Sequence, residues 1–160
     1  MTPDYEVLVG ALVDHRVDFV VVGAVALVLH GSSRVTRDLD ICYSRQPANL
    51  KALAAALKGF RPTLRGAPDT LPFALTAETL ASGLHFTLTC SAGDIDLLGE
   101  VTGIGEFRVV KRLSETMTLY GREVHVLSLE GLERAKRAAG RLKDLADLAE
   151  ILELRKASKR

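Results

Sequence analysis

The most restrictive feature of this sequence is the segment FVVVGAVALVLHGSSRVTRDLDICY, residues 19–43. Its two ends, FVVV and DLDICY, are short apolar runs of the kind found in buried strands. Gly23 follows the first run directly, and AVALVLHG predicts a helix of about two turns that ends at Gly31. This part of the chain must therefore form a strand, a glycine junction, a short helix and a second strand.

Similar patterns predict the rest of the architecture. Thr2 and Pro3 predict the N-cap and first turn of a helix that runs to about His15. Further helices are expected over 46–60, 129–139 and 141–157, and β-hairpins over 84–100 and 116–127. Residues 61–72 hold three of the five prolines and no periodicity, which predicts a surface loop.

These elements predict an α+β fold, an α/β sandwich with a mixed sheet and a helical C-terminus. At 160 residues the chain is expected to be one domain, with a core over 17–127 and C-terminal helices over 128–157. In the last helix, the apolar positions follow helical spacing and predict the face that packs on the domain. They are Leu145, Leu148, Ala149 and Leu152.

The composition excludes several classes of protein. With 48% hydrophobic residues and a net charge of +1, the chain is neither disordered nor a strongly basic nucleic-acid binder. It has no signal-peptide pattern and no apolar run long enough to span a membrane, so a cytoplasmic protein is expected. Cys42 and Cys90 are expected to be buried free thiols. We interpret His15, His85 and His125 as structural or surface residues.

Two carboxylates begin the second strand of the opening segment. Side chains alternate along a strand, so Asp38 and Asp40 share one face, about 7 Å apart at the backbone. Two ionised carboxylates so close together are costly without cations or donors, and a divalent metal would remove that cost. The alternative is that Arg34 and Arg37 neutralise the pair as a surface cluster at the end of the strand.

A second carboxylate pair favours the metal hypothesis over the ion-pair alternative. Asp94 and Asp96 lie in a strand with the same alternation, and Asp96 stands between Ile95 and Leu97 without an obvious structural task. If the two strands are neighbours, Asp96 completes a cluster of three carboxylates. Such a cluster suits a two-metal site for phosphoryl transfer. Asp94 is the alternative third carboxylate, because the two residues could exchange roles.

A phosphate site is predicted at the junction between strand and helix. Gly23 and Ala24 would present backbone N–H groups at the start of the helix. Ser32, Arg34 and Arg37 are candidate phosphate contacts in the segment that follows it. The sequence has neither a P-loop nor a GxGxxG motif, so the junction alone is a weak signal.

The ordered set VGA, thirteen residues, DLD and a later IDLL strand resembles the DNA polymerase beta-like nucleotidyltransferase superfamily. The segment LERAKRAAGRLKDLADLAEIL resembles the closing part of small nucleotidyltransferases related to the abortive-infection type IV toxins. The resemblance implies a nucleotidyltransferase-like mixed sheet with flanking helices. It also implies transfer of a nucleoside monophosphate from a nucleoside triphosphate to a hydroxyl, with two Mg²⁺ ions, for which Mn²⁺ could substitute.

The resemblance also assigns roles to individual residues. It implies that Gly23 binds phosphate through its backbone and that three carboxylates bind metal, namely Asp38, Asp40 and Asp96. It implies a functional pair of Lys136 and Asp144, with Arg141 and Lys143 near the nucleotide phosphates. Ala24 departs from the family's glycine or serine and loses any hydroxyl contact. Each basic residue of the C-terminal helices also has the simpler interpretation of a solvated helix face.

The acceptor stays open between a transfer RNA, another RNA, a protein hydroxyl and a small molecule. A cognate antitoxin is a further candidate partner that the resemblance suggests. One rival hypothesis is a catalytically inactive nucleotide-binding or protein-interaction module of the same fold, favoured by Ala24. Another takes Asp-x-Asp as the metal motif of a sugar-nucleotide glycosyltransferase, for which the chain is short.

Overall fold

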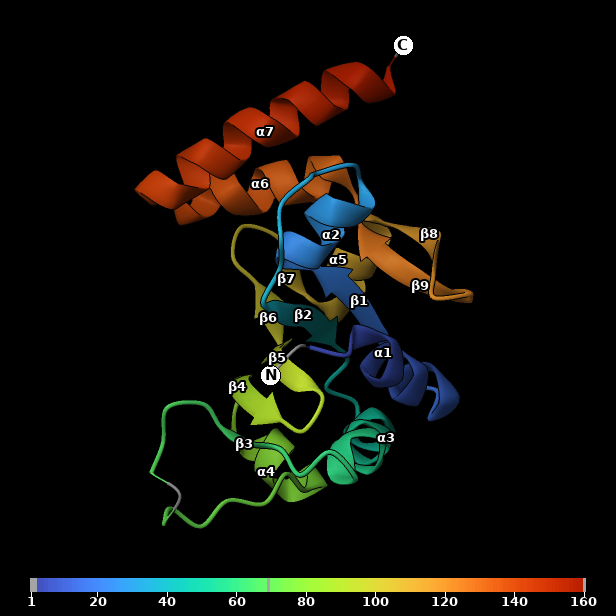
Figure 1. The fold of residues 1–160 in the computed structure, drawn as a ribbon, viewed down its shortest axis with the longest axis vertical. Coiled ribbons are helices and arrows are strands. Elements are labelled where there is room, and N and C mark those ends of the chain that lie inside the picture. The colour runs from blue at the N-terminus through green and yellow to red at the C-terminus, as the bar shows by residue number, and fades with distance from the viewer. Residues whose placement is uncertain (1–2, 69, 160) are drawn as a thin grey trace.

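A computed structural model describes residues 3–68 and 70–159 (Figure 1). Its centre is a seven-stranded sheet with the order β3-β4-β5-β2-β1-β9-β8. The strands are β1 (Phe19–Val22), β2 (Asp38–Tyr43), β3 (Thr63–Leu64), β4 (His85–Cys90), β5 (Gly93–Leu98), β8 (Ser114–Leu119) and β9 (Arg122–Leu127). The pairs β1–β9 and β2–β5 are parallel and the other pairs are antiparallel, so the sheet is mixed as predicted. A separate short ribbon pairs β6 (Glu100–Val101) with β7 (Gly105–Glu106).

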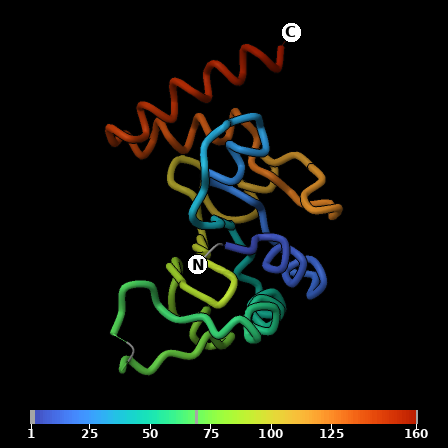
Figure 2. Tube along the Cα trace, in the orientation of Figure 1, coloured from blue at the N-terminus to red at the C-terminus, as the bar shows by residue number. Residues whose placement is uncertain are grey.

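Helices surround this sheet. They are α1 (Tyr5–Asp14), α2 (Gly23–Leu29), α3 (Pro47–Lys58), α4 (Ala77–Ser82), α5 (Phe107–Arg112), α6 (Leu129–Ala139) and α7 (Leu142–Ser158). Helix α2 packs on β1 and β2 and contacts α6, while α1 packs against α3. Figure 2 shows α6 and α7 at one end of the molecule and the chain that follows α3 at the other end.

The core lies along the central strands. All four residues of β1 are buried, and the face of β2 opposite the aspartates buries Leu39 and Ile41 completely. Cys42 and Cys90 are buried free thiols, as the sequence predicts, and burial raises the pKa of Cys42 to about 12. The apolar strand runs therefore form the centre of the sheet, and the carboxylates are left on its other face.

Most predicted elements are confirmed, but the start of the first helix differs and several short elements are additional. Helix α1 begins at Tyr5, because the Asp4 side chain accepts a hydrogen bond from the Val7 N–H and caps it. Pro3 therefore precedes the helix, and the predicted cap at Thr2 lies outside the described residues. The predicted loop over 61–72 contains β3, a two-residue edge strand paired with β4. Helices α4 and α5 and the β6–β7 ribbon were not predicted, because they are too short to show a period.

The predicted packing face of the last helix is wrong. Leu145 and Leu152 are 52% and 37% exposed, whereas the buried residues of α7 are Asp144 and Ile151. The inward face carries carboxylates that pair with cations from neighbouring segments, so apolar periodicity does not mark it. No helix among the described residues is long and apolar enough to cross a membrane.

Candidate functional site

Three carboxylates from two neighbouring strands converge on one face of the sheet. Strands β2 and β5 are parallel, with Asp40 opposite Asp96 and Asp38 opposite Asp94. Residues paired across a ladder point to the same face, so the alternation within each strand brings these carboxylates together. Oxygens of Asp38, Asp40 and Asp96 lie within 4.8 Å of one another, close enough to share a metal ion. This is the set predicted from the sequence.

The backbone at the end of β1 is shaped around Asp40. Val22 pairs with Asp40 across the antiparallel β1–β2 ladder, which places Gly23 beside that carboxylate. Gly23 has φ +67°, and a Cβ atom built on it would lie 2.1 Å from Asp40 Oδ2. Only glycine combines this conformation with that contact. Ala24 occupies the next position in the first turn of α2.

Burial and mutual repulsion change the protonation of the cluster. Burial, followed by the charges of Asp38 and Asp96, raises the pKa of Asp40 to about 8. The pKa of Asp38 is also raised, by burial and then by the charge of Asp96. Among the described residues, the buried Oδ1 of Asp40 has no hydrogen-bond partner. A set of carboxylate oxygens with one buried oxygen unpaired fits a hard divalent cation, which prefers oxygen ligands.

An arginine that sequence reasoning missed lies against this cluster. Arg65 follows β3, and its Nη2 lies 2.8 Å from Asp96 Oδ1 and donates to the Leu88 carbonyl at 2.7 Å. Its Nε lies 3.2 Å from Asp94 Oδ2, and its Nη1 lies 3.9 Å from Asp38 Oδ2. No spacing in the sequence signals this contact, because Arg65 lies in a proline-containing segment without periodicity.

The two arginines that would neutralise the aspartates under the alternative hypothesis do not contact them. Arg34 pairs with Asp147 at 2.8 Å and with Glu150 at 2.5 Å, both on α7. Ser32 is buried and donates to Glu150 at 2.9 Å, so both residues tie this loop to α7. Arg37 is exposed and makes no ion pair with any residue of the described ranges. The hypothesis of an Arg34–Arg37 counter-ion pair is therefore wrong.

The C-terminal candidates form their own ion-pair network. Lys136 Nζ lies 2.9 Å from Asp147 Oδ2 and 3.4 Å from Asp144 Oδ1. Asp144 is fully buried, and Arg141 Nε lies 2.6 Å from its Oδ2. The hydrogen bond from Arg141 is the main cause that lowers the pKa of Asp144 to about 2. Lys143 is exposed beside this network. Asp147 was missed, although it follows Asp144 at i+3 on the same helix face.

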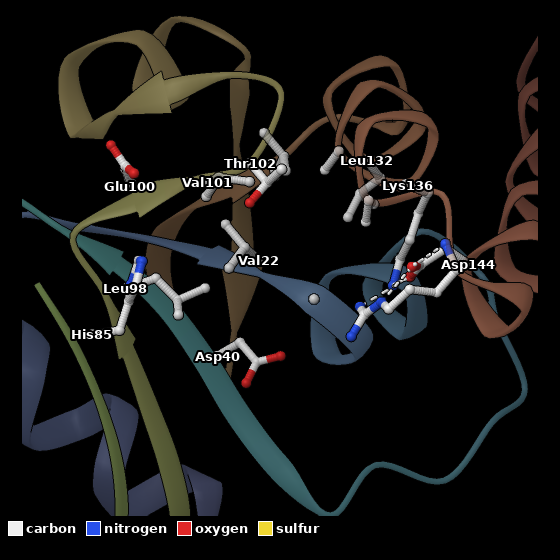
Figure 3. Close-up of a pocket in the computed structure, with 15 residues that line it drawn as sticks. Val22, Asp40, His85, Leu98, Glu100, Val101, Thr102, Leu132, Lys136 and Asp144 are labelled. Carbon is white, nitrogen blue, oxygen red and sulfur yellow. Dashed lines mark hydrogen bonds and ion pairs between the residues drawn. The ribbon is translucent and has the colours of Figure 1, made fainter.

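One cavity of about 240 Å³ connects the two halves of the candidate site (Figure 3). Gly23 and Asp40 line it, together with Lys136, Arg141 and Asp144. The walls between them are mainly apolar and come from β1, β5, β6, β9 and α6. They include Val22, Leu98, Val101, Leu127, Leu132, Ala135 and Ala139. His85, interpreted from the sequence as structural or surface, also lines this cavity, together with Glu100 and Thr102.

The comparison with known structures agrees with this architecture. The chain is similar to a putative nucleotidyltransferase from Thermotoga maritima, with a TM-score of 0.52 over 98% of this chain and 91% of that chain. The fold is nucleotidyltransferase-like. Sequence identity is 15%, so the similarity concerns the fold alone. No protein-family model matches the chain, and no curated protein matches it in sequence.

Proposed function

We propose that this protein is a metal-dependent nucleotidyltransferase. It would transfer a nucleoside monophosphate from a nucleoside triphosphate to a hydroxyl acceptor. The observation that carries the proposal is a cavity lined by Gly23, Asp40, Lys136 and Arg141, on a nucleotidyltransferase-like fold. A cavity that joins a metal-binding carboxylate to basic side chains suits a substrate that arrives with a metal and a triphosphate.

The carboxylates Asp38, Asp40 and Asp96 would hold the metal. Two Mg²⁺ ions are proposed, with Mn²⁺ able to replace them. A bound ion would supply positive charge to the phosphate oxygens and activate the attacking hydroxyl. Asp40 contributes a buried oxygen that has no partner among the described residues, and Gly23 leaves the space that its carboxylate occupies. Asp96 is the third carboxylate in this proposal, because its oxygen, and not that of Asp94, belongs to the clustered set.

The basic residues of the C-terminal helices would balance the triphosphate. Lys136 is held at the cavity by two carboxylates, and Arg141 lines the same cavity. The apolar walls suit a nucleobase, because they offer flat contacts and few polar groups. Lys143, Ala24 and Arg37 stay candidates for weaker nucleotide contacts. Ser32 and Arg34 are engaged with α7, so we propose that they position that helix.

The acceptor is proposed only as a hydroxyl. A transfer RNA, another RNA, a protein side chain and a small molecule all stay candidates. The relation to abortive-infection toxins and a cognate antitoxin also stay predictions. The rival proposal is an inactive nucleotide-binding module, and the Arg65 contacts favour it because an arginine can satisfy the carboxylates without metal.

The test combines binding with turnover. The protein is incubated with each labelled nucleoside triphosphate, Mg²⁺ and a total cell extract, and both the labelled product and released pyrophosphate are measured. We expect pyrophosphate release that requires Mg²⁺ and is lost in Asp40→Asn. Asp94→Asn is the matched control, because Asp94 lies outside the clustered set. Binding that shifts the melting temperature without release of pyrophosphate would favour the inactive module.

A further inference from the structure

One guanidinium group faces most of the acidic residues at the centre of the sheet. Arg65 contacts Asp96, Asp94 and Asp38 at 2.8, 3.2 and 3.9 Å, and its side chain is 28% exposed. Asp96 and Asp38 are two of the three candidate metal ligands. Asp40, the third, makes no ion pair with any residue of the described ranges. Arg65 therefore occupies part of the proposed metal centre and leaves Asp40 free to receive a cation.

The backbone of Arg65 is anchored, whereas its side chain is adaptable. The Arg65 N–H donates to the Thr87 carbonyl at 3.0 Å, which continues the short β3–β4 ladder. The guanidinium reaches the carboxylates through a long flexible stem, and its buried Nε makes no aligned hydrogen bond among the described residues. A change of rotamer would release the carboxylates without movement of the sheet, and it would also break the hydrogen bond from Arg65 Nη2 to the Leu88 carbonyl.

We propose that Arg65 is the counter-ion of the metal-free centre and competes with the metal for Asp38 and Asp96. The inference rests on the proposed function, because it assumes that these carboxylates bind metal. In the metal-free protein the guanidinium offsets the repulsion between the carboxylates and keeps them near each other. When metal binds, it must take over the contacts of Arg65. Arg65 is thus a positioning residue that sets metal affinity.

The competition has a definite sign. The metal ion can bind Asp38 and Asp96 only after the Arg65 guanidinium has left them. The free energy lost when these arginine contacts break therefore lowers the apparent affinity for the metal. Removal of the guanidinium therefore tightens metal binding and destabilises the metal-free protein. A residue with a purely structural role would destabilise the protein without tightening the metal. The two measurements together separate these roles.

The test uses Arg65→Gln, with Arg61→Gln as the matched control. Arg61 lies in the same segment, is exposed and makes no ion pair with the described residues, so its replacement removes the same charge without a carboxylate contact. Mn²⁺ binding is measured without nucleotide from the loss of the free Mn²⁺ paramagnetic resonance signal, and melting temperatures are measured in chelator. We expect Arg65→Gln to bind Mn²⁺ about tenfold more tightly and to melt lower in chelator than the wild type. Arg61→Gln should match the wild type in both.

A second variant keeps the proposal falsifiable if Arg65→Gln does not fold. Arg65→Lys retains the charge but cannot contact several carboxylates with a planar fork, so it should also bind Mn²⁺ more tightly than the wild type. If Arg65→Lys binds Mn²⁺ with wild-type affinity while Arg65→Gln binds it more tightly, the positive charge at position 65 acts through space. That result would contradict competition through direct contacts with the carboxylates.

The failure of this inference differs from the failure of the proposed function. If the wild type and Arg65→Gln bind Mn²⁺ with affinities within about twofold, the metal centre stands and only the competition is overturned. If no variant binds Mn²⁺ at all, the metal centre and the competition fail together, and the proposed function fails with them.

Discussion

The carboxylate of Asp40 occupies the space that a side chain at position 23 would need. A Cβ on Gly23 would lie 2.1 Å from Asp40 Oδ2, and the glycine has φ +67°. The position of the Asp40 carboxylate on β2 therefore depends on a glycine at the start of α2. Any other residue at position 23 would displace this carboxylate, whose buried Oδ1 has no hydrogen-bond partner within residues 3–68 and 70–159.

We first predict that Gly23→Ala abolishes most activity. The strained backbone should cost about 1–2 kcal/mol of unfolding free energy, and displacement of Asp40 should lower turnover on the order of a hundredfold. Gly66→Ala is the control, because Gly66 also has positive φ, +79°, but no atom of the described part of the chain lies within 4 Å of its Cβ position. Urea denaturation and pyrophosphate release measure the two effects. Equal losses of activity in both variants would contradict the contact with Asp40.

The second prediction concerns the charge of the cluster. Replacing Asp38 and Asp40 together with asparagine should remove the metal-induced rise in melting temperature and all metal-dependent transfer. In chelator the double variant should be at least as stable as the wild type, because the replaced carboxylates repel each other and Asp40 makes no ion pair with the described residues. Asp94→Asn should keep the metal response. A double variant that melts lower in chelator, beside a wild type that is insensitive to Mg²⁺, would contradict a metal site.

The third prediction follows from the raised pKa of Asp40. The folded pKa is about 8 and that of an unfolded aspartate is about 4, so the folded protein holds the additional proton between these values. The stability of the metal-free protein should therefore fall as the pH rises from about 4 to 8. Metal displaces the proton, so the metal-induced rise in melting temperature should grow over the same range. Thermal melts in chelator and in Mg²⁺ test this, and Asp40→Asn should show a weaker dependence in both.

The fourth prediction separates Lys136 from its neighbour on α6. Lys136 is 20% exposed and lines the cavity, whereas Arg137 is 55% exposed and pairs with Glu133. Lys136→Ala should lower turnover or triphosphate affinity about a hundredfold, because it removes a charge placed to face the phosphates. The fold should persist, since Asp144 keeps Arg141 as its partner. Arg137→Ala should leave the kinetics unchanged. Normal kinetics in Lys136→Ala would return this lysine to the role of a surface residue.

The fifth prediction tests which face of α7 packs on the domain. Ile151 is fully buried, so Ile151→Ala should cost about 2–5 kcal/mol of unfolding free energy. Leu145 is 52% exposed, so Leu145→Ala should change it by less than about 0.5 kcal/mol. Urea denaturation of the two variants measures the difference. The opposite ranking would restore the face predicted from apolar spacing.

Local chemistry made much of this protein predictable from its sequence. The runs FVVV and DLDICY form the adjacent strands β1 and β2. Gly23 lies where β1 ends and α2 begins, as predicted. The alternation within each strand predicts that Asp38 shares a face with Asp40 and Asp94 with Asp96, and the parallel pairing of β2 with β5 brings the two pairs together. Gly140 separates the two predicted C-terminal helices and ends α6 in a left-handed conformation. These features depend on residues that are close in sequence, where periodicity and backbone preference dominate.

Contacts between distant segments were decided only by the tertiary structure. The sequence offers Arg34 and Arg37 as neighbours of the aspartates, yet Arg65 lies against them because β3 joins the edge of β4. On helix α7, Asp144 is buried and Leu145 is exposed. Ion pairs with Arg141 and Lys136 offset the free-energy cost of desolvating the Asp144 carboxylate. The sequence by itself thus determined the strands, the junction glycine and the acidic face. Which cation meets which carboxylate was decided by chain packing, since charge pairing acts through space and carries no sequence period.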